Sequence, residues 1–304
     1  MQRRQTRQIV WIIIGIVAGL LAWALLTDIR GRSFKEAFEG GSGGPESRVP
    51  KIIWSYWDNP ETIPRTVKFC MESWKRHNPN YEIRMLNKES YKEYVTIPDK
   101  YLNHPNYNDI PAHFADLVRI FILEKHGGIW TDSSILMLQP LDEWLFEGAK
   151  ADTEFYGFYI KRLTGTTPAI ENWFFAAPPK STFMKAWLDE YMHVADYGSI
   201  DEYVESRRKM GVKLFLQGMD NYLFMHVAAQ KVLQMDGYPE AKLKLGVAED
   251  GPFKYLEMGG WNPDVSLDKA CEDPSVHKPF LKMRGNERGT FEHNYDKYSK
   301  CKWT

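Results

Sequence analysis

The chain has 304 residues, 43% of them hydrophobic and 14% aromatic, so it is long enough for one large domain or two small ones with a sizeable core. Its 39 basic and 40 acidic side chains give a net charge of -1 at pH 7. This balance argues against a nucleic-acid partner, because proteins that bind nucleic acids usually carry a strong basic excess.

An apolar segment near the N-terminus is the first element in chain order. Residues 9–26 carry no charge, and as a helix of about 27 Å they are long enough to cross the hydrocarbon core of a bilayer. The arginines that precede them favour a cytoplasmic N-terminus. We therefore predict a cytoplasmic tail at residues 1–8 and a transmembrane signal anchor at 9–26. This makes a single-pass type II membrane protein, with its domain in a Golgi-type lumen in a eukaryote. The alternative is a cleaved signal peptide, for which residues 22–24 form a weak cleavage motif.

The next segment, residues 27–49, is polar and ends in a stretch rich in Gly, Ser and Pro. Such a composition resists ordering, so it predicts a flexible stem. The folded domain is then expected at residues 50–304.

Strands and helices alternate along the first half of this domain, which predicts an α/β layer with a mostly parallel sheet. The last part, from residue 237, is expected to be rich in loops with short strands. Strands are predicted at 51–57, 81–86, 129–131, 134–137, 154–159 and 173–177, and helices at 64–76, 88–94, 110–126, 182–194 and 218–232.

The most informative stretch is residues 110–134, which read as a helix, a glycine stop, a short strand and an acidic residue. Asp116 and Arg119 are three apart on the helix and share a face. The glycine pair at 127–128 ends the helix, because glycine adopts the left-handed cap conformation cheaply. Asp132 then emerges at the tip of the strand. A carboxylate in that position suits a metal ion bridged to a phosphorylated ligand.

The three cysteines are far apart and show no Cys-x-x-Cys spacing, which argues against a zinc site. Cys271 and Cys301 can pair if the domain faces an oxidising compartment, and Cys70 is then left over. In the alternative, all three thiols stay unpaired.

Three patterns together resemble a known family: Pro50-Lys51-Ile52-Ile53 at the first strand, Asp-x-x-Arg at 116–119, and Gly-Gly-Ile-Trp-Thr-Asp at 127–132. They resemble the capsular polysaccharide synthesis proteins, related to glycosyltransferase family 32, among the sugar-transferring enzymes with a DxD motif. The likeness covers about residues 50 to 300. It implies a GT-A type fold, a UDP- or GDP-sugar donor, a glycan or other hydroxyl acceptor, and manganese or magnesium as cofactor.

The resemblance also implies a metal site. Asp132 is its first acid and a catalytic candidate, since a divalent cation can neutralise the charge that grows on a leaving phosphate. The second acid of the family falls at Ser134, so the motif here is Asp-Ser-Ser. A late histidine often completes such sites, and His277 is the expected third ligand. Ser133 lies between the two motif positions and is expected to contact the donor.

Donor contacts are expected from both ends of the domain. Asp116 and Arg119 match the family's donor-sugar contacts. The alternative is a surface ion pair, but the helix is apolar almost all round and is therefore expected to be buried. Trp57 matches the base-stacking position, with Tyr56 as its neighbouring alternative; otherwise Trp57 and Trp54 are both core residues. Lys278 is the expected diphosphate contact.

Two residues are candidates for contact with the acceptor. Asn172 lies in an Asn-Trp-Phe element that resembles the family's acceptor strand, and Asp220 is a helix N-cap or a general base. Together with the resemblance, the sequence predicts a membrane-anchored, metal-assisted glycosyltransferase, and the resemblance implies that the enzyme retains anomeric configuration. The alternative is a non-catalytic sugar-binding module with a degenerate metal motif. A phosphotransferase is less favoured, because no P-loop motif appears.

Overall fold

The computed structural model describes residues 48–273 and 278–303. The chain divides into two units, Met1–Gly43 and Gly44–Thr304, and all of the described residues belong to the second unit. The predicted tail and anchor, and nearly all of the predicted stem, lie outside the described residues. Within the described ranges, no helix combines the length and the apolar character needed to cross a bilayer.

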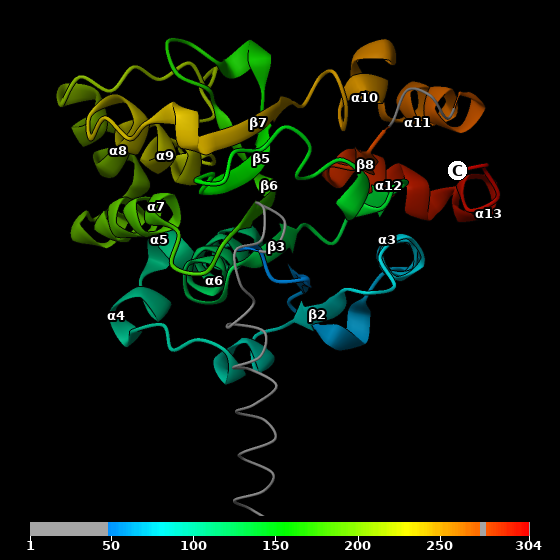
Figure 1. The fold of residues 1–304 in the computed structure, drawn as a ribbon, viewed down its shortest axis with the longest axis horizontal. Helices are drawn as coiled ribbons and strands as arrows, with labels where there is room; N and C mark the ends of the chain where they lie inside the picture. Colours follow the sequence, from blue (N-terminus) through cyan, green and yellow to red (C-terminus); the bar gives the residue numbers. More distant parts are fainter. Residues whose placement is uncertain (1–47, 274–277, 304) are drawn as a thin grey trace, which may run out of the picture. The chain divides into compact units, whose positions relative to one another are not determined.

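A six-stranded sheet in the order β2-β1-β3-β6-β5-β7 forms the centre of the domain (Figure 1). Only β6 runs opposite to its neighbours, and the other five strands share one direction. The predicted α/β class with a mostly parallel sheet is confirmed. The strands are β1 (Ile52–Tyr56), β2 (Glu82–Leu86), β3 (Gly128–Thr131), β5 (Phe155–Tyr159), β6 (Ile170–Ala177) and β7 (Leu243–Val247), and a second, two-stranded sheet pairs β4 (Ile135–Met137) with β8 (Phe280–Lys282).

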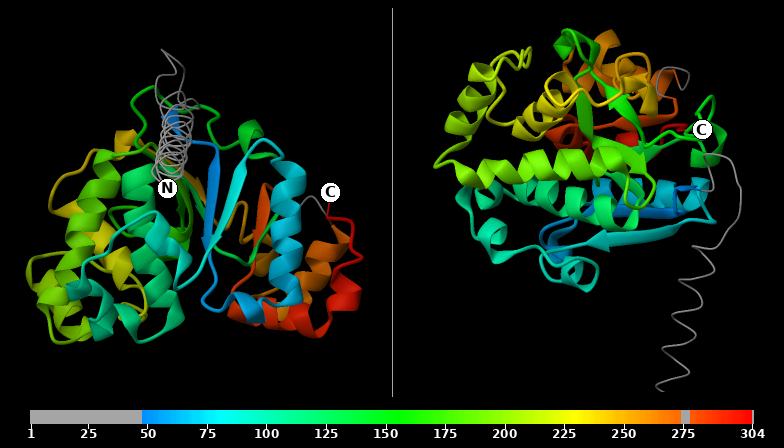
Figure 2. Two further views of the ribbon diagram at one scale, coloured as in Figure 1. Left: turned by 90° about the horizontal axis from the view of Figure 1, so that it is seen from below. Right: turned by 60° about the vertical axis from the view of Figure 1, so that its left-hand side comes forward.

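The helices gather in two groups on opposite sides of the central sheet (Figure 2). On one side α6 packs against β1, β3 and β6 and against α7, which packs on α9. On the other side α3 packs against β4 and α12. The α-helices are α3 (Arg65–His77), α4 (Asp99–Leu102), α5 (Pro105–Asn108), α6 (Pro111–His126), α7 (Thr182–Met192), α8 (Ile200–Lys209), α9 (Phe224–Gln234), α10 (Lys254–Met258), α11 (Pro263–Glu272), α12 (Gly285–His293) and α13 (Tyr295–Tyr298).

Two predicted elements need correction. The helix expected at 218–232 begins only at Phe224, because Gln217 and Gly218 have positive φ angles of 54° and 79° that are incompatible with a continuous helix. From residue 237 the structure has the expected short strands, β7 and β8, but also four short helices, α10 to α13, which were not predicted because the periodicity of short helices is hard to recognise. Helix α8 was not predicted.

The turn from α6 into β3 requires glycine. Gly127 caps the helix with a φ of 62°, and its N–H donates to the Leu123 carbonyl. A Cβ at Gly127 would lie 2.5 Å from the backbone nitrogen of Pro179, and one at Gly128 would lie 2.8 Å from the Ile52 carbonyl. The glycines therefore let β3 start beside β1 directly after the helix, which fixes where Asp132 emerges.

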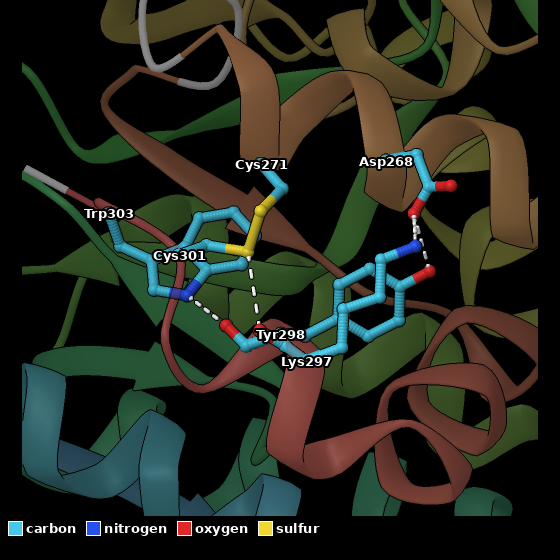
Figure 3. Close-up of a disulfide and its surroundings, with 6 residues drawn as sticks. All are labelled: Asp268, Cys271, Lys297, Tyr298, Cys301 and Trp303. Carbon is cyan, nitrogen blue, oxygen red and sulfur yellow. Dashed lines mark hydrogen bonds and ion pairs between the residues drawn. A yellow bond between two sulfur atoms is a disulfide. The ribbon is translucent and has the colours of Figure 1, made fainter.

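Cys271 and Cys301 form a disulfide that ties α11 to the segment after α13 (Figure 3). Asp268, one turn earlier on α11, joins the same two elements by accepting from Lys297 Nζ at 2.5 Å and from the Tyr298 hydroxyl at 2.8 Å. Cys70 is free and buried. Of the two alternatives that the sequence left open, the paired one is therefore correct.

We expect replacement of both Cys271 and Cys301 by alanine to lower the free energy of unfolding by about 2–4 kcal/mol, because the bridge closes a loop with a sequence separation of 30. Urea unfolding followed by circular dichroism measures this. Reductant should destabilise the wild type by a similar amount and leave the double variant unchanged. Equal sensitivity of both proteins to reductant would contradict the prediction.

Helix α3 receives its N-terminal cap from another helix. Its N-cap residue Pro64 offers no side-chain bond, but Glu292 of α12 accepts from the Thr66 N–H at 2.8 Å and pairs with Arg65 at 3.1 Å. Burial raises the pKa of Glu292, but the Thr66 hydrogen bonds and Arg65 outweigh it and hold that pKa below the ordinary 4.5. The ionised carboxylate therefore stabilises the fold above about pH 4.5, and this contribution is lost as the pH falls through the lowered pKa.

We expect Glu292→Gln to cost about 1 kcal/mol of unfolding free energy at pH 7, a typical value for a helix cap. The difference in unfolding free energy between Glu292→Gln and the wild type should become smaller in unfolding curves recorded below pH 4.5. Glu205→Gln on the exposed surface of α8 is the control and should stay within about 0.5 kcal/mol at either pH. If the difference in unfolding free energy between Glu292→Gln and the wild type instead grows on acidification, the ionised carboxylate is not the group that caps α3.

Candidate active site

The predicted helix pair Asp116 and Arg119 is buried rather than on the surface. The two residues expose 5% and 4% of their surface, and Arg119 Nη2 lies 3.1 Å from Asp116 Oδ1. The neighbouring residues on α6 are apolar, and Leu117, Val118 and Ile120 are fully buried. Buried charges need partners, so this pair is part of an internal network and not a surface ion pair.

Arg119 organises that network. Besides Asp116, its guanidinium donates to Asp132 Oδ1 at 3.2 Å and to the Asn172 carbonyl, and it lies 4.9 Å from the centre of the Trp130 ring. A planar fork of N–H donors suits this set of partners, which comes from α6, β3 and β6. The helix and the strand tip of residues 110–134 therefore meet at one guanidinium.

Asp132 lies directly after β3, and its own N–H donates to the Trp173 carbonyl of β6 at 2.7 Å. About 27% of its side chain is exposed, so it is accessible to a ligand. Burial alone would raise the pKa of Asp132, but Lys282 and then Arg119 outweigh it and hold that pKa below its ordinary value. Asp132 is therefore a carboxylate at neutral pH.

The strongest partner of Asp132 is a residue that sequence reasoning missed. Lys282, at the end of β8, places its Nζ 2.7 Å from Asp132 Oδ2 and 3.5 Å from Ser134 Oγ. Its side chain is 8% exposed. It lies 150 residues from Asp132 in the sequence, and only the pairing of β8 with β4 brings the two together.

Asn172 supports the acidic end of the network. Its Nδ2 donates to Asp116 Oδ1 at 3.0 Å, while its carbonyl accepts from Arg119. Burial raises the pKa of Asp116, and Arg119 only partly offsets that rise. The structure thus brings together four of the predicted residues, namely Asp116, Arg119, Asp132 and Asn172.

The base-stacking candidates lie at the end of β1, next to β3 in the sheet. Trp57 is half-buried, and the Arg288 guanidinium of α12 lies 5.5 Å from the centre of its ring. Tyr56 is buried, its hydroxyl donates to Asp58 at 2.9 Å, and its ring packs on Phe114. Of the two base-stacking candidates, Trp57 is therefore the one whose ring is partly accessible beside the site, whereas Tyr56 is a core residue.

Of the predicted metal ligands, the two that the structure describes, Asp132 and Ser134, do not by themselves make a site for a divalent cation. The Lys282 ammonium already bridges Asp132 and Ser134, the two predicted ligands from the motif. Ser134 is 2% exposed and donates its hydroxyl to the Met283 carbonyl at 2.8 Å, and Ser133 is also buried. One carboxylate that already carries two cationic partners is a poor site for a dication. His277 lies outside the described residues.

The remaining predicted residues lie apart from this network. Asp220 is buried and accepts from Arg208 of α8 at 2.9 Å, while its other oxygen has no partner. Tyr222, two residues on, is close enough to the site that Asp116 and Asp132 add to the rise that burial causes in its pKa. Lys278 is exposed just before β8.

Comparisons with known proteins agree with these motifs. Residues 41–204 match the family described as "Capsular polysaccharide synthesis protein", a stretch that contains Asp116, Arg119, Asp132 and Asn172. The O-glycosyltransferase braB of Annulohypoxylon truncatum is 28% identical over 162 residues, which cover 48% of this chain and 38% of that protein. The initiation-specific alpha-1,6-mannosyltransferase of Candida albicans is 30% identical over 114 residues, which cover 32% of this chain and 27% of that protein.

The chain thus spans less than two-fifths of the length of these curated relatives. Among solved structures, the galactosyltransferase LgtC is similar with a TM-score of 0.42 and 13% identity, over 82% of this chain and 95% of that one. The prediction of a relationship to glycosyltransferases is confirmed. Because the family match covers more than half of its residues, the chain belongs to the capsular polysaccharide synthesis protein family.

Proposed function

We propose that this protein is a glycosyltransferase that moves a sugar from a nucleotide-sugar donor to a hydroxyl group of a glycan or other acceptor. The observation that carries the proposal is the Arg119 guanidinium held between Asp116 and Asp132 at the end of β3. Ligands of open α/β sheets bind at the carboxyl ends of the strands. Trp57 and Asp132 follow the parallel neighbours β1 and β3 at that edge, as a base platform and a phosphate-side carboxylate would. A GT-A type fold is part of the same proposal.

In the proposed reaction, the bond between the anomeric carbon and the diphosphate oxygen breaks, and its electron pair leaves with the nucleoside diphosphate. The acceptor oxygen forms the new bond to the anomeric carbon and loses its proton. In a retaining course, which we favour from the family resemblance, a leaving phosphate oxygen takes that proton. In an inverting course Asp220 is the candidate base.

Asp116 and Asn172 are assigned to the sugar. Their carboxylate and amide groups, 3.0 Å apart, can accept from and donate to neighbouring hydroxyl groups. Arg119 holds both acids in place and faces the phosphate side through Asp132. The divalent cation that the family resemblance implies stays a prediction, and no step above depends on it.

The test uses the purified full chain in detergent with UDP- and GDP-sugars and simple glycan acceptors, with the products identified by mass spectrometry. We expect an acceptor whose mass rises by one sugar residue. Donor binding without transfer or hydrolysis would favour the binding module that the Asp-Ser-Ser motif suggests. A mass increase by one phosphate would indicate the phosphotransferase instead, and neither binding nor turnover would refute the proposal.

We also propose that residues 9–26 anchor the protein as a single-pass type II membrane protein, with the domain on the non-cytoplasmic side. The disulfide between Cys271 and Cys301 supports this orientation, because disulfides persist in oxidising compartments. Sealed membrane vesicles with the cytoplasmic side outward should protect the domain from protease until detergent is added. Digestion without detergent would place the domain on the cytoplasmic side.

A further inference from the structure

Two cationic side chains, Lys282 beside Asp132 and Arg288 over Trp57, have no part in the network described by the sequence motifs. Lys282 carries three N–H groups on its ammonium, and within the described residues Asp132 and Ser134 are the acceptors for two of them. Arg288 is half-buried over Trp57, and no carboxylate in the described part of the chain pairs with it. Each of these residues can therefore still donate to a ligand.

Lys282 lies beside Asp132, and Arg288 lies over Trp57, which follows the strand paired with the strand before Asp132. Burial raises the pKa of the Cys70 thiol, and Lys282 and Arg288 are the two charges that oppose that rise. They are held by consecutive elements, since α12 begins at Gly285, three residues after the end of β8. Arg119 and Lys282 pair with Asp116 and Asp132, whereas no carboxylate among the described residues pairs with Arg288, so its charge can meet an anionic ligand.

We propose that Lys282 and Arg288 hold the diphosphate of the donor and supply the positive charge that a divalent cation would otherwise provide. This inference rests on the proposed function and assigns its diphosphate site. The position favours it, because Lys282 occupies the space between the two motif residues where the cation was expected. Arg288 sits above the proposed base platform, where a guanidinium can reach a phosphate next to the nucleoside.

In the transfer step, these two residues do not change their covalent bonds. The electron pair of the breaking bond moves onto the diphosphate oxygen, and the fixed charges of Lys282 and Arg288 stabilise the negative charge that grows there. Asp132 keeps Lys282 in place through the 2.7 Å contact. Ser134 does not need to be an acid, which accounts for the Asp-Ser-Ser motif.

The experiment measures the binding of UDP and of GDP to the full chain in detergent by isothermal titration calorimetry, once with EDTA and once with manganese. We expect the better of the two nucleotides to bind with dissociation constants that agree within about twofold between the two buffers. Lys282→Met should weaken binding about 10- to 100-fold and Arg288→Met about 10-fold, as expected for lost charge-assisted hydrogen bonds. Lys209→Met is the matched control, since Lys209 is 75% exposed on α8, and it should bind like the wild type.

The outcomes separate the inference from the function on which it rests. Binding that appears only with manganese, together with unchanged affinity in Lys282→Met and Arg288→Met, would overturn the inference and leave the glycosyltransferase intact. Binding of neither nucleotide in either buffer would refute both. If Lys282→Met does not fold, Arg288→Met decides alone, because the contact of Arg288 over the Trp57 ring is not an ion pair and no carboxylate in residues 48–273 and 278–303 pairs with it.

Discussion

Asp132→Asn is expected to reduce sugar transfer by about 100-fold or more and to lower the free energy of unfolding by about 2–3 kcal/mol. The side chain keeps its shape but loses the charge that positions Lys282 and Arg119. Breaking a buried ion pair typically costs 3–5 kcal/mol, and the 27% exposure of Asp132 reduces that figure. A displacement of about 1 Å among catalytic groups is enough for a 100-fold loss. Steady-state kinetics and urea unfolding measure the two effects.

Asp189→Asn is the matched control for this variant. Asp189 contacts Lys185 at 2.5 Å on α7, but both side chains are 57% exposed, and exposed pairs contribute about 0–1 kcal/mol. We therefore expect unchanged activity and nearly unchanged stability. Near-normal transfer by Asp132→Asn would remove this carboxylate from the catalytic site.

The parts of the site that could be predicted from the sequence depend on local geometry. Asp116 and Arg119 are three apart on a helix, so they share a face regardless of where that helix lies in the fold. The conformation of Gly127 likewise ends the helix regardless of what the helix packs against. The short strand after the glycines then delivers Asp132 without any long-range information. For this reason a single segment of the chain specifies both halves of the network.

Lys282 could not be predicted in this way. It is one of many lysines in the sequence, and its strand β8 has only three residues, Phe280–Lys282. Its position depends on pairing with β4, which reads as an ordinary strand of the main sheet but forms a separate one. The motif alone predicts Ser134 as a metal ligand, whereas its hydroxyl donates to the Met283 carbonyl, a contact that depends on the same distant segment.

Arg119→Lys is expected to lower kcat/KM for the donor by about 100-fold, although the charge is kept. Lysine can approach one carboxylate, but it cannot donate to Asp116, Asp132 and the Asn172 carbonyl at once. Each lost charge-assisted hydrogen bond contributes about 1.5–3 kcal/mol. Because these bonds hold the two acids relative to each other, we expect both kcat and KM to change. The measurement is transfer rate against donor concentration, corrected for the folded fraction.

Arg207→Lys separates this catalytic effect from a loss of stability. Arg207 is also buried, donates to Glu190 at 2.6 Å and to the Tyr197 hydroxyl at 2.7 Å, and lies over the Tyr203 ring, but none of these residues belongs to the proposed site. Both variants should therefore unfold at lower urea concentrations than the wild type. Only Arg119→Lys should lose activity per folded molecule. Equal kinetic losses in the two variants would mean that Arg119 acts through the stability of the fold and makes no contact that the reaction needs.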